Sequence, residues 1–407
     1  MNRRRTIIKG LAGTVPLGLL SGNVSLAEET QATTSSGRDY YAELGLKPFI
    51  NAAGAYSAYG GARMLPEVVD AMRYAATRKV KVRELHDAVG KRIAKLVGSE
   101  AAIVTSGATA SIVLGTAACM TGGDEEMMRR LPDTDGLPNE VIVQKKHRYT
   151  YDKALTVPGA VIVEVESETD VRKLVNERTA MLFFLKPTQQ GDNIPAERFI
   201  ALGAELNVPV FCDAATTTPP ASNVADAAKE GFDLVCYSGG KGLRGPYSAG
   251  LLIGRSDLIA AARRHAAPND ISIGRGMKVS IEEYIGMLVA LETGLGFSEA
   301  DDHAWKQARF DRIIGTISDI SGVTAHTFIS EGHAREMYLE IDWDTNAIEL
   351  SREAFVQALR DHEPSIEIRL FLFSGGRIHL SATVMDEGED QLVGKIIRKV
   401  LLAHQRA

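Results

Sequence analysis

The chain has 407 residues, with 46 Lys or Arg against 52 Asp or Glu, and 45% of its residues are hydrophobic. That length is enough for two domains, or for one large and one small domain, with a substantial core. The formal net charge of −6 argues against a nucleic-acid-binding surface, because such a surface needs a dense basic face. No run of 18 apolar residues occurs, so no membrane-spanning helix is expected.

The first residues have the organisation of an export signal. The segment Arg4-Arg5-Thr6-Ile7-Ile8-Lys9 matches the twin-arginine pattern, a modestly apolar stretch follows, and Ser25-Leu26-Ala27 suits signal peptidase. We therefore predict a twin-arginine signal peptide over residues 1–27 and a polar, disordered tether over 28–44. The mature protein would then be periplasmic or extracellular. The alternative is a basic N-terminus that stays in the cytoplasm.

Cysteine usage is sparse. Cys119, Cys212 and Cys236 all lie within apolar runs, and their spacing matches neither a disulfide framework nor a zinc site. We interpret them as buried thiols, although an exported protein could form one disulfide. No metal site is predicted.

Helices and strands alternate through most of the chain. From residue 64 to 98, apolar side chains recur at helical spacing, which predicts two helices. Short apolar runs of strand length follow, with helical segments such as 170–177 and 195–206 between several of them. The runs cover residues 141–143, 161–165, 181–185, 208–212, 234–237 and 250–253. Uninterrupted apolar strands separated by helices predict a mainly parallel, seven-stranded type of sheet between helices.

The last hundred residues have a different pattern. After a long helical stretch from residue 280 to about 312, the sequence predicts antiparallel strands flanked by helices. The strands are expected at 337–342, 366–373 and 377–381, and the helices at 351–361 and 391–404. We therefore predict an α/β architecture with a large domain over residues 45–310 and a small C-terminal α+β domain over 311–407.

Ligands in open α/β sheets bind beyond the carboxyl ends of the strands, so the polar residues after each apolar run are the candidates. The first group is Thr105-Ser106-Gly107-Ala108-Thr109, which precedes a helix. Its small residues allow backbone N–H groups at the helix N-terminus to approach a phosphate. The Lys-Ser/Thr pair of a nucleotide-binding P-loop is missing, and a plain helix cap would explain the group equally well.

Two further groups carry an acid and an amine. Asp213 directly follows a buried run, and the small residues after it, including Ala215, leave room for a flat ring. A helix cap is the alternative role for this acid. Most lysines lie on the surface, but Lys241 is enclosed by glycines in Ser238-Gly239-Gly240-Lys241-Gly242 at a strand end. Such a desolvated amine loses its proton more easily and can form a Schiff base.

The fourth group contains His147, which either stacks on a ring or is an ordinary surface histidine. A phosphate cradle, a platform for a planar ring, a carboxylate for a pyridine nitrogen and an amine for an aldehyde together meet the needs of pyridoxal 5'-phosphate (PLP). A dinucleotide oxidoreductase is disfavoured because no G-x-G-x-x-G follows an early strand.

With these motifs the chain resembles the selenocysteine synthase-like branch of fold-type I PLP-dependent enzymes, which includes D-glucosaminate-6-phosphate ammonia-lyase. The resemblance covers roughly residues 45 to 400. The matching motifs are Phe49-Ile50-Asn51-Ala52-Ala53-Gly54, Ser99-Glu100-Ala101-Ala102 with Thr105-Ser106-Gly107-Ala108, Val210-Phe211-Cys212-Asp213-Ala214-Ala215, Ser238-Gly239-Gly240-Lys241-Gly242 and Ile273-Gly274-Arg275-Gly276-Met277-Lys278.

The resemblance implies a role for each candidate residue. Lys241 would form the Schiff base and move protons, and Asp213 would pair with the pyridine nitrogen. The phosphate would be held by Ser106, Gly107, Ala108 and Ser238, with His147 stacked on the ring and Ala215 against it. Arg275 would bind a substrate anion, and Arg63 and Arg377 are weaker candidates for which surface salt bridges are the alternative.

Two departures from the family leave the substrate open. Family members often have a Lys before Glu282-Glu283, where this chain has Ser280-Ile281. The N-terminal extension that selenocysteine synthase uses around its transfer RNA is also absent, and export argues against a transfer-RNA substrate.

We therefore expect a PLP-dependent enzyme that acts at Cα of an amino acid or amino sugar acid. Elimination of ammonia to give a 2-oxo acid is the leading hypothesis, with an aminotransferase or racemase second. A non-catalytic periplasmic ligand-binding protein is the alternative of another class. The resemblance also implies a homodimer or higher homo-oligomer, in which residues 51–64 could reach a neighbouring subunit.

Overall fold

The computed structural model describes residues 37–186, 193–330, 336–371 and 376–406. The predicted signal peptide and most of the predicted tether lie outside these residues. The described residues up to Pro48 and those from Phe49 onward form two units. In the first unit, the short helix α1 (Tyr40–Glu43) is capped by the side chain of Asp39, which accepts hydrogen bonds from two backbone N–H groups.

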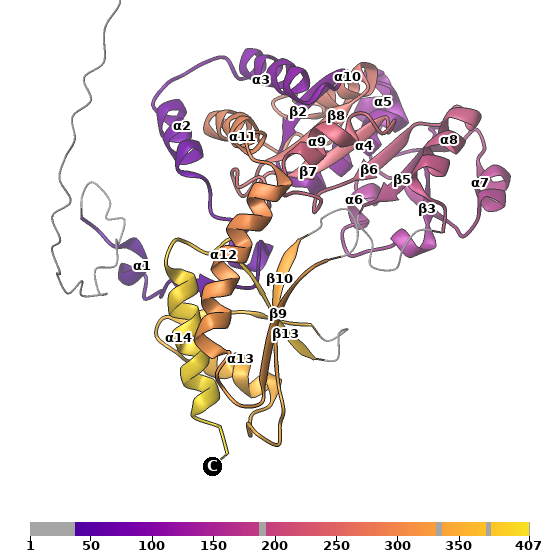
Figure 1. The fold of residues 1–407 in the computed structure, drawn as a ribbon. Coiled ribbons are helices and arrows are strands. Elements are labelled where there is room, and N and C mark those ends of the chain that lie inside the picture. Colours follow the sequence, from indigo (N-terminus) through magenta and orange to yellow (C-terminus); the bar gives the residue numbers. More distant parts are fainter. Residues whose placement is uncertain (1–36, 187–192, 331–335, 372–375, 407) are drawn as a thin grey trace, which may run out of the picture. The chain divides into compact units, whose positions relative to one another are not determined.

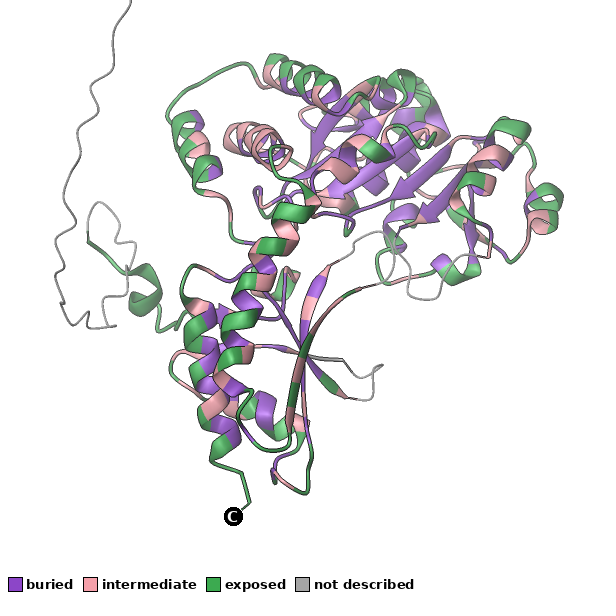
Figure 2. Ribbon diagram, viewed as in Figure 1, coloured by how far each residue is buried: buried purple, intermediate pink, exposed green. Residues whose placement is uncertain are grey.

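A seven-stranded sheet forms the centre of the second unit, with the order β2-β8-β7-β6-β5-β3-β4. Only β8 runs antiparallel to its neighbours, so the prediction of a mainly parallel sheet is confirmed. The strands are β2 (Ala101–Thr105), β3 (Glu140–Gln144), β4 (Val161–Val165), β5 (Thr179–Leu185), β6 (Val210–Asp213), β7 (Leu234–Ser238) and β8 (Gly250–Gly254). Its central strands are buried, as Figure 2 shows, which explains why they read as uninterrupted apolar runs.

Helices cover both faces of this sheet (Figure 1) and divide its core into two clusters. One face is packed by α3 (Val82–Val97), α8 (Ala196–Leu206), α9 (Ser222–Ala227) and α11 (Ile281–Gly294). The other is packed by α4 (Gly107–Thr121), α6 (Lys153–Thr156) and α10 (Ser256–His265). Helix α2 (Pro66–Ala76) packs on α11. The other short helical elements of this region are α5 (Glu125–Arg130), α7 (Glu168–Leu174), η1 (Ser57–Tyr59) and η2 (Lys145–His147).

A second, four-stranded antiparallel sheet has the order β12-β13-β10-β9. Its strands are β9 (Val323–Ile329), β10 (Met337–Trp343), β12 (Arg369–Phe371) and β13 (Arg377–Ser381). The core beneath it is closed by α12 (Glu299–Ile317), α13 (Arg352–Arg360) and α14 (Glu389–Leu402). The predicted small α+β region is therefore present.

Two predicted elements differ in detail. The long helix expected from residue 280 is two helices, because Ser298 and Asp301 form a capping box that starts α12. The strand expected at 366–373 is also divided: β11 (Ser365–Glu367) pairs in parallel with β1 (Phe49–Asn51), and β12 joins the antiparallel sheet. The predicted domain boundary at residue 310 falls within α12 and stays a prediction.

Among the described helices, none has both the length and the apolar character needed to cross a bilayer. Cys212 and Cys236 are buried as predicted, whereas Cys119 is only partly buried, and none of the three forms a disulfide within the described residues. Within the described part of the chain, His, Cys, Asp and Glu side chains form no group suited to a metal ion.

Candidate active site

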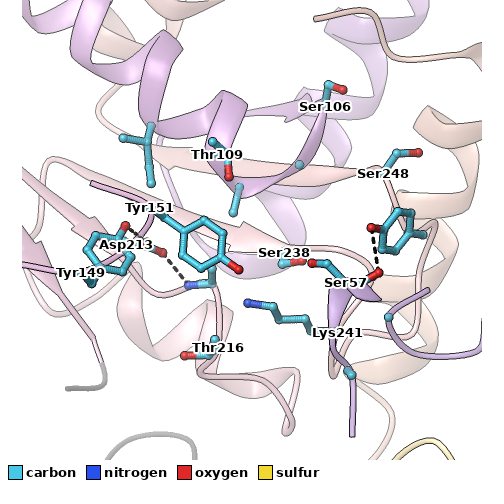
Figure 3. Close-up of a pocket in the computed structure, with 18 of the residues that line it drawn as sticks. Ser57, Ser106, Thr109, Tyr149, Tyr151, Asp213, Thr216, Ser238, Lys241 and Ser248 are labelled. Carbon is cyan, nitrogen blue, oxygen red and sulfur yellow. Dashed lines mark hydrogen bonds between the residues drawn. The ribbon is translucent and has the colours of Figure 1, made fainter. Parts of the chain in front are cut away.

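A cavity of about 420 Å³ lies at the carboxyl ends of β5, β6 and β7 and at the start of α4 (Figure 3). This is the edge at which the sequence predicted a site. The predicted residues that line it are Ser106, Gly107, Ala108, Asp213, Ala215, Ser238 and Lys241. The topology therefore brings together groups from three separate segments of the chain.

Lys241 lies in the turn after β7, and the glycines around it allow a very close approach of neighbouring backbone. A Cβ atom on Gly240 would lie 2.6 Å from the Cα of Tyr247, and one on Gly242 would lie 2.1 Å from the backbone N of Pro219. Burial lowers the pKa of Lys241, while the Asp213 carboxylate opposes that shift. The amine therefore becomes neutral, and nucleophilic, more easily than a surface lysine.

Asp213 ends β6 and is only 4% exposed. Its Oδ1 accepts a hydrogen bond from the backbone N–H of Ala215 at 2.9 Å and lies 3.5 Å from the Sγ of Cys236. Its Oδ2 accepts a hydrogen bond from the phenol of Tyr149 (Figure 3). A buried carboxyl group needs such hydrogen-bond partners, and these hold the Asp213 oxygens in place at the cavity wall.

The N-terminus of α4 forms an anion cradle opposite these groups. The Ser106 side chain makes no capping hydrogen bond, so it leaves the first backbone N–H groups of this 15-residue helix available to an anion. Gly107 adopts a positive φ of 81°, which favours glycine. A Cβ on Gly250 would lie only 2.3 Å from the carbonyl carbon of Gly107, so β8 packs directly beneath the cradle.

Several lining residues were not predicted from the sequence. Tyr149, Tyr151, Lys186, Thr216 and Ser248 all contribute to the cavity. They come from loops, where no periodic pattern marks a residue as facing a ligand. The one available signal was position, since Lys186 and Thr216 follow predicted strands as closely as the chosen candidates do.

His147 lies outside this cavity. It is fully buried at the end of η2, its ring meets the ring of Phe184 edge-on at 4.5 Å, and its Nδ1 accepts a hydrogen bond from the backbone N–H of Leu185. The 3₁₀ turn after β3 directs the side chain into the core. This position does not suit the predicted stacking role, and the aromatic rings that line the cavity are those of Tyr149 and Tyr151.

The three predicted substrate arginines also lie outside the cavity lining. Arg275 pairs with Asp270 at 3.2 Å, Arg377 pairs with Glu340 at 3.0 Å, and Arg63 pairs with Asp386. These are the surface salt bridges that the sequence left as the alternative for Arg63 and Arg377.

Another arginine is better placed. Arg369 of β12 lies over the ring of Tyr56, with 4.7 Å between its Cζ and the ring centroid. Burial lowers the pKa of Arg369, which marks a guanidinium withdrawn from water. Tyr56 lies between Ala55 and Ser57, and both of these residues line the cavity. Arg369 therefore contacts a residue whose two chain neighbours line the cavity.

Comparisons with known proteins agree with this geometry. No family model matches the chain. The chain is 30% identical over 373 residues to D-glucosaminate-6-phosphate ammonia lyase from Salmonella typhimurium, a match that covers 88% of this chain and 97% of the relative. It belongs to this family of PLP-dependent enzymes. A solved structure of D-glucosaminate-6-phosphate ammonia-lyase superimposes with a TM-score of 0.79 at 26% identity, covering 90% of this chain and 99% of that one.

A second relative in the family has a different printed activity. The 5'-C-glycyluridine monooxygenase-decarboxylase from a Streptomyces species is also 30% identical, over 378 residues that cover 89% of this chain and 92% of the relative. The fold-type I architecture predicted from the sequence is confirmed. The two names show that the family fold supports more than one reaction.

The residues of the cavity fit PLP. An amine with a lowered pKa, a buried carboxylate and an uncapped helix N-terminus match the aldehyde, the ring nitrogen and the phosphate of this cofactor. The cavity volume lies in the range typical of small-molecule sites.

Proposed function

We propose that this protein is a PLP-dependent carbon–nitrogen lyase that acts on an amino sugar acid, or on another amino acid with a leaving group such as hydroxyl at Cβ. Loss of the Cα proton and of the Cβ group as water, followed by hydrolysis of the imine, gives ammonia and a 2-oxo acid without an oxidant. The observation that carries the proposal is the arrangement of Lys241, Asp213 and the α4 N-terminus around one cavity, in a chain of this family. The name of the Salmonella relative supports the substrate class and the loss of ammonia.

Each part of the cofactor would have a partner in the cavity. Lys241 would hold the aldehyde carbon, and Asp213 would pair with the ring nitrogen. The N–H groups at Gly107 and Ala108, with the Ser106 and Ser238 hydroxyls, would hold the phosphate. Tyr149 and Tyr151 would supply the aromatic surface that the sequence assigned to His147. When bound, PLP supplies an electron-withdrawing ring that stabilises negative charge at the substrate Cα.

The protein's own groups would then bind the substrate and move protons. The Lys241 amine would take the proton from Cα, and its lowered pKa favours the neutral form that can do so. Arg369 would hold the substrate carboxylate, since a partly buried guanidinium binds that group in two parallel hydrogen bonds.

A single-substrate assay tests the reaction. Purified protein is incubated with PLP and one candidate at a time, namely D-glucosaminate 6-phosphate, D-glucosaminate, or D- and L-amino acids. We expect ammonia and a 2-oxo acid in equal amounts without any added acceptor, and no turnover by Lys241→Ala. Dependence on an added 2-oxo acid would refute the lyase and indicate an aminotransferase, and loss of optical activity alone would indicate a racemase. A protein that takes up no PLP would support a non-catalytic binding role.

The Streptomyces relative favours a second candidate, oxidative decarboxylation of an amino acid. Its identity to this chain equals that of the ammonia lyase, so sequence similarity alone does not separate them. Uptake of dioxygen and release of carbon dioxide in the same assay would favour this activity over ammonia elimination.

Assembly and location remain proposals as well. We propose a homo-oligomer with a small-molecule substrate, and export by the twin-arginine route to the periplasm. Changing Arg4-Arg5 to a Lys pair should retain the protein in the cytoplasm of a bacterial host, as measured by cell fractionation. A distribution that the change leaves unaltered would contradict export by this route. A strictly monomeric active protein on sizing would contradict the assembly.

A further inference from the structure

Tyr149 makes a contact for which neither the family motifs nor the proposed reaction provides a role. Its phenol donates a hydrogen bond to Oδ2 of Asp213, the carboxylate expected to face the cofactor. Both residues line the same cavity, and Figure 3 shows the phenol directed at the carboxylate.

The backbone around Tyr149 is held in place. The guanidinium of Arg148 pairs with Asp152 and Glu164, and the backbone N–H of Tyr149 donates to Oδ2 of Asp152 at 3.3 Å. The Tyr149 ring stacks on Phe183 with 6.4 Å between centroids and 21° between planes. The contact with Asp213 is therefore built by a rigid segment rather than by a mobile side chain.

The phenol can act only as a donor in this contact. Burial, and then the neighbouring Asp213 charge, raise the pKa of Tyr149 far above its ordinary value, so the phenol keeps its proton. Asp213 Oδ1 already accepts from the Ala215 N–H, while Oδ2 has one lone pair left once Tyr149 is bound. A ring nitrogen in the cavity would share Oδ2 with the phenol.

We propose that Tyr149 is a positioning residue that keeps the shared proton on the ring nitrogen of PLP instead of on Asp213. This inference rests on the proposed function. Hydrogen-bond donors favour the ionised form of a carboxylate, so each donor to Asp213 weakens its hold on a further proton. A protonated ring nitrogen is the state in which the cofactor withdraws electrons best. Tyr149 would therefore set the electronic state of the cofactor without touching the substrate.

The test compares Tyr149→Phe with Tyr151→Phe in the PLP-bound protein. Tyr151 is the matched control, because its ring lies 5.9 Å from that of Tyr149 and lines the same cavity, while the phenol bonded to Asp213 is that of Tyr149. The readout is the nitrogen-15 resonance of ring-labelled PLP, which reports directly whether the ring nitrogen carries a proton. Phe keeps the stacking on Phe183, and unchanged melting temperatures confirm that each variant is folded.

We expect the resonance of the unmodified protein and of Tyr151→Phe at the protonated position, and that of Tyr149→Phe shifted toward the unprotonated one. An unchanged resonance in Tyr149→Phe, or an equal shift in Tyr151→Phe, would overturn the inference. Failure of the unmodified protein to take up PLP would instead overturn the proposed function.

Discussion

Gly242 is the point at which the loop carrying Lys241 touches the loop that follows Asp213. A Cβ atom at this position would lie 2.1 Å from the backbone N of Pro219 and 2.2 Å from the carbonyl of Thr218. Ordinary van der Waals contact begins at 3.4 Å, so in Gly242→Ala the two loops must separate by roughly 1 Å. The neighbouring atoms are backbone, which cannot turn aside as a flexible side chain can.

The cost of this change follows from its two effects. Forcing a methyl group into a packed contact destabilises a protein by about 1–3 kcal/mol. A displacement of about 1 Å between catalytic groups lowers activity by on the order of 100-fold. We expect Gly242→Ala to show a lower free energy of unfolding in urea and a larger loss of turnover than the stability change explains.

Gly315 provides the matched control. It lies on the exposed face of α12 with nothing within 4 Å of an added Cβ, so Gly315→Ala should stabilise the protein by about 0.5–1 kcal/mol. If Gly242→Ala unfolds at the same urea concentration as the unmodified protein and binds PLP as tightly, the result would contradict a close contact between these two loops.

Two pH effects follow from burial. The rate at which PLP attaches to Lys241 should rise with pH, with a midpoint below 10.5, because burial lowers the pKa of this amine. Asp213→Asn should move the midpoint lower still, because the Asp213 carboxylate opposes that shift. Stopped-flow absorbance measures both midpoints, and a higher midpoint in Asp213→Asn would contradict the assignment. Burial also lowers the pKa of His86 to about 3, so the unfolded chain takes up a proton between pH 6.5 and 3 that the folded chain refuses, and stability is lost as the pH falls through that window. Urea unfolding at neutral and mildly acidic pH should therefore show a smaller acid loss in His86→Phe than in the unmodified protein, and an equal loss in both would refute the role of His86.

Much of the fold could be predicted because burial on both faces leaves a plain pattern in the sequence. Strands such as β5 and β7 are buried along their length and read as apolar runs of strand length. Asp213 and Lys241 could be chosen because each directly follows such a run, where parallel sheets bind ligands. The sequence could not separate β11 from β12, since the chain changes sheets there without a turn signal.

The rest of the site depends on tertiary contacts that leave no periodic pattern. The segment that contains Ser57 is held against the Lys241 loop by backbone hydrogen bonds, such as the one from the Ala62 N–H to the Gly240 carbonyl at 2.7 Å. Tyr149 and His147 are two residues apart, and only the direction of the η2 turn decides which of them meets Asp213. A sequence pattern does not encode that direction.

The most direct test of the central claim is to locate the amine that binds PLP. The protein would be incubated with PLP, reduced with borohydride, digested and analysed by mass spectrometry. We expect one reduced PLP per chain on the peptide containing Lys241, and no label in Lys241→Ala. Lys186 lines the same cavity, but its amine is buried in an ion pair with Glu230, so it should stay unlabelled. Label on Lys186, or an unlabelled protein after incubation with excess PLP, would contradict the assigned chemistry.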